Sequence, residues 1–515
     1  LLIRNTTATH TIAGNTIRDN GSVGVLLDSA GSGCSVTGNS IINNGLFGTY
    51  DGIAVFNSSP SIENNGITGN TGYGLEVGGT GKPTSIKSNV ITGNTLGSIY
   101  LEAGVSGEPL VENTNSIAGP IHIGGGNISA STIWGGNTFV YYITNSVTVN
   151  SGATLFVAQD TIVKFAQGAG LDVSGTLDAQ AAQNAMIYFT DYRDDTAGGD
   201  TNGDGNSTVP AQGWWARITI YPGAAATLDY CVIRYASSDS FGTNIYKSGA
   251  GAFSIRHCEI SNGGFYGVII EDNSPTLVGN TIHSNYTGIY VTGSTAAPTI
   301  YQNTIFSNAI GIECESSAAA TIGGSAVNMN MIYNNSSYGV YNGVSTVTVN
   351  ATFNYWGSSS GPYHPTTNPN ATGNEVSNFV NYGNFIPSVN GSPVITSAGS
   401  ATGITGQPFT YTITATGNAP LSVGATALPA GLSLTGDTIS GTPSSSGNTS
   451  VTLSATNAAG ADTKKLALTI YDPANKPISP SPTNGATDIG LTPTLSWSDG
   501  GGATAYEVYF GTTNP

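Results

Sequence analysis

A short pattern, Asn-x-Ile-x-x-Asn, recurs through much of the first 390 residues of this 515-residue chain and constrains its fold more than any other feature. Seven copies begin, in order, at Asn15, Asn39, Asn65, Asn89, Asn280, Asn303 and Asn330. Within each of the two groups, successive copies start 23 to 27 residues apart. Repeats of this length are supersecondary units that bury their apolar residues by stacking on their neighbours. The sequence therefore predicts a solenoid.

Each repeat contains three short apolar segments, which we expect to be three strands of one coil. The first often follows Pro, as in SPSIENN and APTIYQN, and the third opens with Gly, as in GLEV and GIYV. The middle segment carries the motif, and ten isoleucines are in register there: Ile17, Ile41, Ile67, Ile91, Ile117, Ile233, Ile260, Ile282, Ile305 and Ile332. We expect the motif asparagines to adopt the left-handed turn conformation and to hydrogen-bond from coil to coil.

On these motifs, residues 1 to 390 resemble right-handed parallel β-helix repeat proteins. That group includes pectate lyase-like enzymes, mannuronan epimerases, phage tailspikes and secreted surface proteins. The resemblance implies an all-β fold with three strands and about 24 residues per coil. The segment from Val147 is similar to the entry coils of such proteins, and the segment from Asn354 to their closing segment. We expect two β-helix sections, residues 1–135 and residues 136–390. The first section begins within a repeat.

The sequence changes character after residue 390. LPAGLSLTGDTISGTP and ATNAAG closely resemble the Ig-like modules of bacterial and archaeal surface proteins, which implies a β-sandwich over 391–472. Residues 473–515 look like the first strands of a fibronectin type III-like module. Half a sandwich would leave Trp497, Tyr506, Val508 and Phe510 to be buried, so we expect that the chain is truncated there. The alternative is that another molecule completes the sheet.

Composition narrows the classes of partner. The chain has 30 acidic and 13 basic residues and a net charge of −17, so it cannot neutralise a phosphate backbone, and nucleic acid is excluded. The sequence contains no apolar run long enough to span a membrane. The 71 glycines and 23 prolines favour strands and turns over helices. Together with the resemblance, this composition indicates an extracellular or cell-surface location.

The segment DTNGDGN predicts a metal site. Asp200, Asn202, Asp204 and Asn206 alternate around a glycine, which resembles a calcium-binding loop, because alternate oxygen side chains can converge on one hard cation. The usual glutamate is absent, and Asp194 or Asp195 would supply the missing carboxylate. We therefore expect a structural Ca²⁺. A polar surface insertion without a metal is the alternative.

A candidate binding face lies on the third strand of the second group of repeats. Tyr290, Glu313 and Tyr341 are predicted to form one outward column, with Glu271 and Glu315 in a neighbouring one. Aromatic rings and carboxylates suit sugar binding, and two carboxylates could perform glycosidase chemistry. The alternative is an ordinary exposed face, since Tyr favours strands and Glu keeps a surface soluble.

Two further pairs of residues are candidates for chemistry. Arg234 and His283 share an outward column, but they are two coils and roughly 10 Å apart, which is too far for one proton transfer. They are therefore expected to be a solvated surface pair. Cys231 and Cys258 replace Asn in adjacent coils, within disulfide range, although buried thiols are the expected outcome.

Together these features predict an extracellular structural or adhesive protein. It would be a rigid β-solenoid with Ig-like modules on a prokaryotic cell surface, or in an extracellular filament or layer, and not an enzyme. The predicted partners are further copies of the chain or other surface proteins, and polysaccharide in addition. Two alternatives remain open for the face of residues 267–341: a polysaccharide lyase, epimerase or glycosidase, and a non-catalytic glycan-binding protein.

Overall fold

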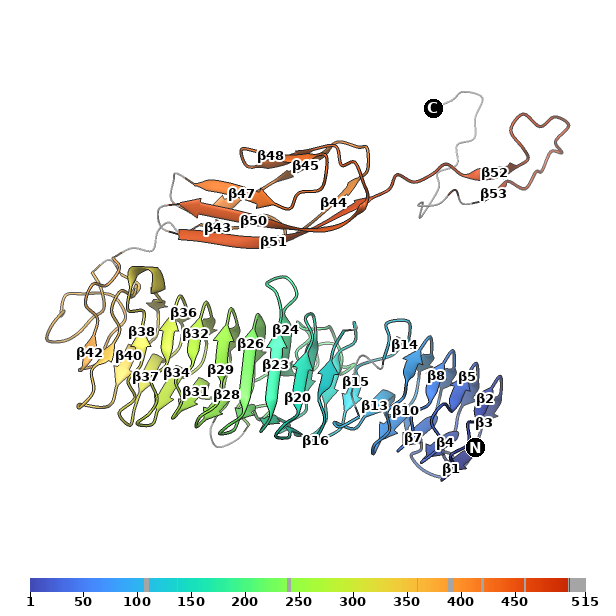
Figure 1. Ribbon diagram of the computed structural model, residues 1–515, viewed down its shortest axis with the longest axis horizontal. Helices are drawn as coiled ribbons and strands as arrows, with labels where there is room; N and C mark the ends of the chain where they lie inside the picture. Colours follow the sequence, from blue (N-terminus) through green and yellow to red (C-terminus); the bar gives the residue numbers. More distant parts are fainter. Residues whose placement is uncertain are drawn as a thin grey trace. The chain divides into compact units, whose positions relative to one another are not determined.

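A computed structural model gives the fold of the chain (Figure 1). It describes residues 1–105, 111–136, 138–238, 242–358, 360–387, 393–417, 421–457, 460–498 and 500. The chain divides into two compact units, Leu1–Ser388 and Val389–Pro515. No helix among the described residues is long and apolar enough to cross a membrane.

The first unit is a parallel β-helix whose successive strands enter three sheets in turn. The longest, sheet A, runs through the whole unit in the order β1 (Leu2–Arg4), β4 (Val25–Asp28), β7 (Ile53–Phe56), β10 (Tyr73–Gly78), β13 (Gly97–Leu101), β15 (Ile121–Ile123), β18 (Tyr141–Ile143), β21 (Ile162–Phe165), β24 (Ile187–Asp191), β27 (Cys231–Arg234), β30 (Glu259–Ser261), β33 (Thr281–His283), β36 (Thr304–Phe306) and β39 (Met331–Tyr333).

The other two sheets of the early coils are sheets B and C. Sheet B contains β2 (Thr11–Ala13), β5 (Ser35–Thr37), β8 (Ser61–Glu63) and β11 (Ser85–Lys87). Sheet C contains β3 (Thr16–Arg18), β6 (Ser40–Ile42), β9 (Gly66–Thr68), β12 (Val90–Thr92) and β14 (Ser116–Ile117).

In the later coils, two separate sheets, D and E, take the places that sheets B and C have in the early coils. Sheet D contains β16 (Gly126–Ile128), β19 (Val147–Val149), β22 (Leu171–Val173), β25 (Ile218–Ile220), β28 (Thr243–Ser248), β31 (Tyr266–Glu271), β34 (Thr287–Thr292), β37 (Ile310–Cys314) and β40 (Tyr338–Asn342). Sheet E contains β17 (Thr132–Trp134), β20 (Thr154–Val157), β23 (Thr176–Gln180), β26 (Ala225–Asp229), β29 (Phe253–Arg256), β32 (Thr276–Val278), β35 (Thr299–Tyr301), β38 (Thr321–Ile322), β41 (Val349–Asn350) and β42 (Val380–Asn381). A short 3₁₀ helix, η1, spans Ala326–Asn328.

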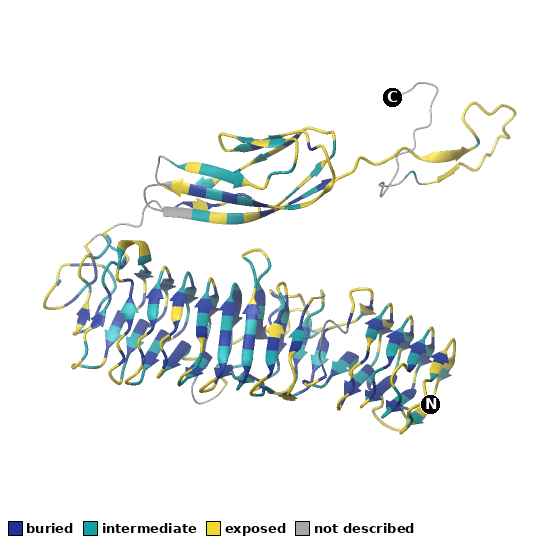
Figure 2. Cartoon of the chain, viewed as in Figure 1, coloured by how far each residue is buried: buried dark blue, intermediate teal, exposed yellow. Residues whose placement is uncertain are grey.

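Alternation along each strand builds the core. In β34, Ile289 and Val291 are fully buried, while Tyr290 between them is partly exposed. Because side chains of adjacent strand residues point to opposite faces, every coil sends its aliphatic residues inward. Figure 2 shows this alternation as buried and partly exposed bands along the β-helix.

Both asparagines of the motif form buried ladders, as expected. Asn65 is typical: its side-chain amide donates to the carbonyls of Val36 and Glu63 and to Asn89 Oδ1 at 2.9 to 3.0 Å. Its own Oδ1 accepts from the backbone and the side chain of Asn39. The side chain of Asn65 therefore bonds to backbone groups of its own coil and of the preceding coil, and to the asparagine side chain of the next coil. In the second group of repeats, Cys258 occupies a ladder position and its backbone N–H donates to Asn280.

The expectation about left-handed backbone was wrong by one residue. The positive φ belongs to the residue before most of the ladder asparagines, for example Asn64 (58°), Gly69 (69°) and Ser307 (54°), although Met329 before Asn330 has a φ of −52°. This preceding residue makes the bend. The asparagine that follows points its amide inward, where it can bond to the next coil.

The ten motif isoleucines form two columns rather than one. Five lie in sheet C: Ile17, Ile41, Ile67, Ile91 and Ile117. The other five lie in sheet A: Ile233, Ile260, Ile282, Ile305 and Ile332. The coils between the two groups lack the motif. When the motif returns in the second group, it lies on the next sheet along the chain, sheet A instead of sheet C. The Gly-led strands therefore lie in sheet A in the first group and in sheet D in the second.

Residues 351–387 close the C-terminal end of the β-helix. Asn354 and Asn374 end the two ladders by accepting from Asn330 and Asn335. Trp356, which belongs to this segment, is fully buried. The apolar interior of the last coils is consequently covered by the chain itself.

The second unit contains a β-sandwich. One sheet has the order β44 (Ser400–Ile404), β51 (Gly460–Tyr471), β50 (Gly447–Asn457) and β47 (Ser422–Thr426), and the other β45 (Phe409–Thr412), β49 (Thr438–Gly441) and β48 (Leu432–Thr435). Two small pairs are β43 (Val394–Ile395) with β46 (Ala415–Thr416), and β52 (Ile478–Ser481) with β53 (Ser496–Ser498). Its own apolar core includes Ile439, Leu453 and Leu468.

The predicted fibronectin type III-like segment is only partly described. Trp497, in β53, is 38% exposed. Tyr506, Val508 and Phe510 lie outside the described residues. That part of the domain division stays a prediction, as do the boundaries at 135, 390 and 472.

Candidate functional sites

The outward side of sheet D brings the predicted sugar-binding residues together. Register pairs Tyr290 with Glu313, and Glu313 with Tyr341, so these three form one column across β34, β37 and β40. The inward neighbours Ile289 and Ile312 are fully buried and fix the orientation of the column. The sequence-based placement of this column agrees with the strand register.

A neighbouring column carries the other two predicted glutamates. Glu271 pairs with Thr292 at the ends of β31 and β34. Glu315 directly follows β37, and its backbone N–H donates to the carbonyl of Val291. We call Glu271, Tyr290, Glu313, Glu315 and Tyr341, together with Tyr266 of β31, the tyrosine–glutamate face.

Aromatic rings lie close together along this face. The ring centroids are 4.9 Å apart for Tyr266 and Tyr290, and 5.2 Å apart for Tyr338 and Tyr341. In the turns that lead into β31 and β34, Phe265 and Tyr286 are 41% and 49% exposed, with centroids 4.3 Å apart. Adjacent exposed aromatic rings are typical of ligand-binding surfaces.

The carboxylates of the face lack basic partners. Glu313 accepts a hydrogen bond from Thr287 Oγ1 at 3.0 Å, and Glu271 accepts one from Ser248 Oγ at 3.0 Å and another from the Tyr246 hydroxyl. Burial raises the pKa of Glu313; the Thr287 bond partly opposes this and the charge of Glu315 adds to it. Within the described part of the chain, none of the three glutamates on this face forms an ion pair.

The face ends in a pocket at the C-terminal closing segment. Its volume is about 270 Å³, and its lining includes Tyr338, Tyr341, His364 and Glu375. Glu315 lies at its edge, because a Cβ added at the lining residue Gly343 would be only 2.0 Å from Glu315 Oε1. The column of the face is thus continuous with a concave site.

A second aromatic cluster, not predicted from the sequence, lies on the outward side of sheet A. The hydroxyl of Tyr73 is 3.1 Å from His122 Nδ1, and burial lowers the pKa of His122 to about 4. Gly97 makes this contact possible, since a Cβ there would be 3.2 Å from His122 Nε2. Tyr142 stacks on Tyr192 at 3.7 Å. The irregular coils around β15 and β18 carry no motif that would have revealed this alignment.

A carboxyl pair lies beside this cluster. Asp51 is largely buried, and its Oδ1 accepts from the backbone N–H of Tyr73 at 2.7 Å. Burial, followed by hydrogen bonding to Asp51 and the negative charges of Asp51 and Glu102, raises the pKa of Glu76 to about 8. Glu76 is therefore protonated at neutral pH. The sequence signal, an Asp before one Gly-led strand and a Glu in the next, was too general to single out this pair.

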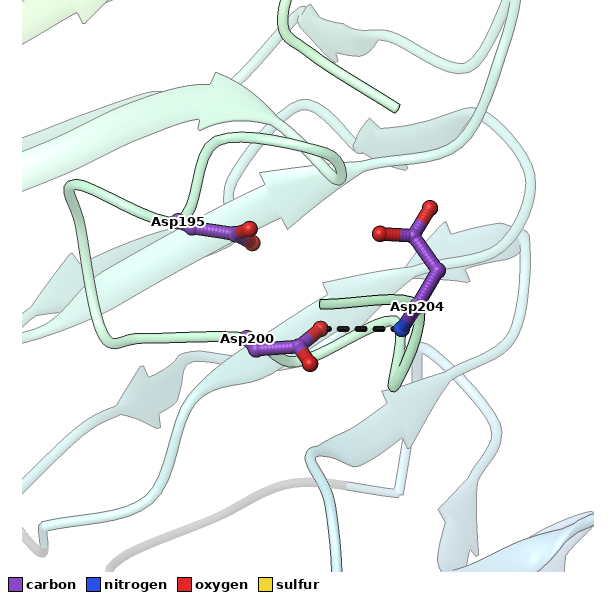
Figure 3. A group of neighbouring side chains, drawn as sticks. All are labelled: Asp195, Asp200 and Asp204. Atoms are coloured by element: carbon purple, nitrogen blue, oxygen red, sulfur yellow. Dashed lines mark hydrogen bonds between the residues drawn. The ribbon is translucent and has the colours of Figure 1, made fainter. Parts of the chain in front are cut away.

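The acidic insertion between β24 and β25 brings three of the predicted metal ligands together. Carboxylate oxygens of Asp195, Asp200 and Asp204 lie within 4.8 Å of one another (Figure 3). Asp200 Oδ1 also accepts from the backbone N–H of Asp204 at 3.1 Å. One oxygen each of Asp195, Asn202 and Asp204 is buried without a hydrogen-bond partner. Four of the six predicted residues therefore contribute to one small region.

Asp194 and Asn206 do not join this group. Asp194 is fully buried in an ion pair with Arg234 at 2.7 Å and accepts from the hydroxyls of Thr190 and Thr196. Asn206 is exposed. The sequence identified the residue types of this insertion but not which of two adjacent aspartates turns toward the loop.

Charge pairing leaves the three-aspartate group unbalanced. Asp191 is paired with Arg193 at 2.6 Å, as Asp194 is with Arg234. Lys164, which is fully buried under the insertion, donates to the Gly199 carbonyl at 3.0 Å and to Thr201 Oγ1 at 2.5 Å. Three carboxylates with one nearby ammonium leave a formal charge of about −2, which a divalent cation would neutralise.

The two remaining pairs are structural. Arg234 and His283 are two coils apart in one column of sheet A, through Ser261. Arg234 binds Asp194, and His283 Nε2 lies 3.5 Å from Glu259. All four cysteines are buried free thiols. The backbone N–H of Cys231 donates to Cys258 Sγ at 3.4 Å, so these cysteines extend an asparagine ladder.

Comparison with known proteins agrees with the two-unit architecture. Residues 1–116 and 206–354, just over half of the chain, match the family described as "Right handed beta helix region", and residues 392–471 match "Putative Ig domain". Both kinds of domain are typical of secreted or surface proteins, and the β-helix fold also occurs in polysaccharide-active enzymes. A search of curated proteins gave no match.

Two crystal structures from Bacteroides fragilis share a short similar stretch. One is of a "putative alpha-galactosidase/melibiase" and the other of a "putative alpha-galactosidase", at 32% and 36% identity and a TM-score of 0.15 each. The similarity covers 16% of this chain and 18% of each of theirs. So small an overlap carries no argument about function.

Proposed function

The chain belongs to the right-handed β-helix family, and from this premise we propose that it is an extracellular adhesive protein rather than an enzyme. The β-helix is a rigid scaffold, and its tyrosine–glutamate face binds a glycan. The Ig-like module is a further surface-type domain of the same chain. This location and this role are consistent with the kinds of domain that the chain combines.

Rigidity follows from the ladders and from sheet A. Each buried asparagine bonds to neighbouring coils, and sheet A continues through fourteen strands of the described chain. The closing segment covers the interior at the C-terminal end, which disfavours coil-on-coil polymerisation there. We therefore favour adhesion over assembly into a filament, although side-by-side association with other surface proteins is compatible with this scaffold.

One observation carries the proposal: the strand register that aligns Tyr290, Glu313 and Tyr341 beside a pocket. Sugar rings pack their apolar C–H faces on aromatic side chains, and acceptors orient their hydroxyls. The rings of this face can stack on a sugar, and its carboxylates can accept from sugar hydroxyls. Because these side chains are half-buried on a fixed backbone, binding costs them little conformational entropy.

The test is binding of the whole chain to a panel of soluble polysaccharides and oligosaccharides. For a bound glycan, Tyr290→Ala and Tyr341→Ala are each expected to weaken affinity about tenfold, because each removes one stacking surface. Tyr301→Ala is the matched control, since Tyr301 ends β35 of sheet E, in the coil next to Tyr290 but on another sheet. Absence of binding across the panel, or equal losses in all three variants, would overturn the proposal.

We also propose that the acidic insertion binds a structural Ca²⁺. Asp195, Asp200 and Asp204, with Asn202, would hold the ion, and the orphaned oxygens of three of these side chains would gain a partner. The ion would fix the insertion above Lys164. No step of binding or chemistry is assigned to it.

The Asp51–Glu76 pair favours a second candidate function, a polysaccharide-active enzyme. A carboxyl group that stays protonated at neutral pH is suited to act as a general acid toward a glycosidic oxygen. The same polysaccharide panel separates the two functions. Release of new reducing ends that is lost in Glu76→Gln would favour the enzyme, whereas binding without turnover favours the adhesive protein.

A further inference from the structure

The tyrosine–glutamate face points to a class of glycan. We infer that its ligand is a chain of amino sugars with free, positively charged amino groups, and not a neutral glycan or a polyuronide. This inference rests on the proposed glycan-binding function and adds the charge of the ligand.

The first step is the charge of the face. Glu271, Glu313 and Glu315 are joined at the pocket by Glu375. Among the described residues, none of these four carboxylates takes part in an ion pair. Five acidic residues elsewhere in the β-helix each pair with an arginine or a lysine: Asp28, Glu63, Asp191, Asp194 and Asp229. A row of unneutralised carboxylates repels a polyanion.

In the described part of the chain, no glutamate of the face forms an ion pair with a basic side chain of sheet D or of the segment before it. Lys247 is fully buried, and its ammonium donates to the carbonyls of Tyr221, Ser248 and Ala250. Arg217 lies before β25, with its guanidinium 5.4 Å from the centre of the Tyr246 ring. A cationic ligand would therefore give these carboxylates the ionic partner that they lack among the described residues.

The second step is the spacing of the carboxylates. Within the described chain, three metal-ligating side chains converge within 4.8 Å only at Asp195, Asp200 and Asp204. The glutamates of the face are instead spread along the β-helix: Glu313 and Glu315 belong to the coil of β37, and Glu271 ends β31, two coils and roughly 10 Å away. This separation is comparable to the length of a disaccharide in an extended chain, so a polymer can present charged groups to both positions.

The third step is the tyrosines between the carboxylates. Tyr290 and Tyr341 flank Glu313 in the same column. A tyrosine ring attracts an ammonium group as well as the C–H face of a sugar, and a carboxylate beside it strengthens the attraction. The partial burial that raises the pKa of Glu313 also makes its anion costly when unpaired, so a cation would relieve that cost.

The pocket fits one terminal unit. At about 270 Å³ it is smaller than most drug-sized sites, which begin near 300 Å³. Tyr338, Tyr341 and Glu375 line it, and Glu315 reaches its edge because Gly343 has no side chain. A single amino sugar would have rings beneath it and carboxylates beside it.

The experiment uses calorimetry to measure the affinity of the whole chain for three hexasaccharides, at about pH 6 and about 0.15 M salt. The probes are hexaglucosamine, hexa-N-acetylglucosamine and hexagalacturonate. We expect hexaglucosamine to bind at least about tenfold more tightly than the acetylated form, and hexagalacturonate not to bind. The double variant Glu313→Gln, Glu315→Gln should lose this preference and keep its affinity for the acetylated probe.

Controls separate the possible failures. Glu112→Gln, an exposed glutamate outside the face, should change nothing. Equal binding of the amino and acetylated probes, or tighter binding of hexagalacturonate, would overturn the inference and leave the glycan-binding function standing. Failure of every glycan would reject both. Tighter binding of oligolysine than of hexaglucosamine would overturn the inference in favour of a basic protein partner.

Discussion

At the scale of single residues, the chain is organised by side chains that complete the hydrogen bonding of another coil. A ladder asparagine bonds to backbone carbonyls that have no backbone partner at the turn. The residue before most of these asparagines adopts the left-handed conformation, which turns the amide inward. Each such turn therefore needs a residue that tolerates positive φ, followed directly by an asparagine. This is why Gly, Asn and Ser precede the ladder asparagines so often.

Removing one ladder side chain should therefore be costly. Asn65→Ala deletes bonds to Val36, Glu63 and Asn89 and leaves buried polar groups without partners. We expect the free energy of unfolding to fall by about 3 kcal/mol, measured by urea titration. Asn15→Ala, at the exposed end of the same ladder, should cost about 0.5 kcal/mol. Equal losses would mean that the ladder bonds add nothing to stability.

Glu76 should make stability depend on pH. Its pKa rises from 4.5 to about 8 on folding, so the folded chain keeps a proton that the unfolded chain releases across that interval. Stability conferred by this group is thus lost as pH rises through the interval. Glu76→Gln stays neutral, so its melting temperature relative to the parent should increase from pH 5 to pH 8. A difference that does not change with pH would contradict the assignment.

At the scale of elements, the sequence predicts strands better than it predicts which sheet they enter. The Asn-x-Ile strands were recognisable because Ile and Asn recur at fixed offsets. Their sheet changes from sheet C at Ile117 to sheet A at Ile233, across coils that lack the motif, so no repeated residue marks where the change occurs. The same reasoning explains the sites. Tyr290 and Glu313 lie in regular coils and could be aligned, whereas Tyr73 and His122 lie in or beside irregular ones.

The insertion after β24 should be ordered further by calcium. At a hundredfold excess over the dissociation constant, Ca²⁺ should stabilise the β-helix unit by about 2.7 kcal/mol, and a chelator should reverse this. The measurement is thermal unfolding with and without the ion. Asp195→Asn and Asp204→Asn should abolish the response, because each removes a ligand charge. Asp160→Asn, an exposed carboxylate elsewhere, should retain it. Stabilisation that persists in all three variants would argue against this site.

At the scale of the whole molecule, the architecture was predictable because it is made of repeated units. The β-helix is indicated by ten isoleucines and two asparagine columns, which repeat the same local pattern many times. The Ig-like module is indicated by the long matching segment LPAGLSLTGDTISGTP. The functional sites are not repeated. The Asp51–Glu76 pair and the choice of Asp195 over Asp194 depend on single contacts between distant coils, which no periodic pattern encodes.

The change of sheet by the motif has a consequence for how such a chain can vary. Gain or loss of a full coil inside either group of repeats lengthens or shortens the rod but keeps every later strand on its own side. Gain or loss of a single strand in the middle coils would turn all later coils by one side of the triangular cross-section. The coils without the motif therefore determine on which side of the β-helix the tyrosine–glutamate face lies, relative to the aromatic cluster on sheet A. They fix the angle about the helix axis between the two groups of repeats.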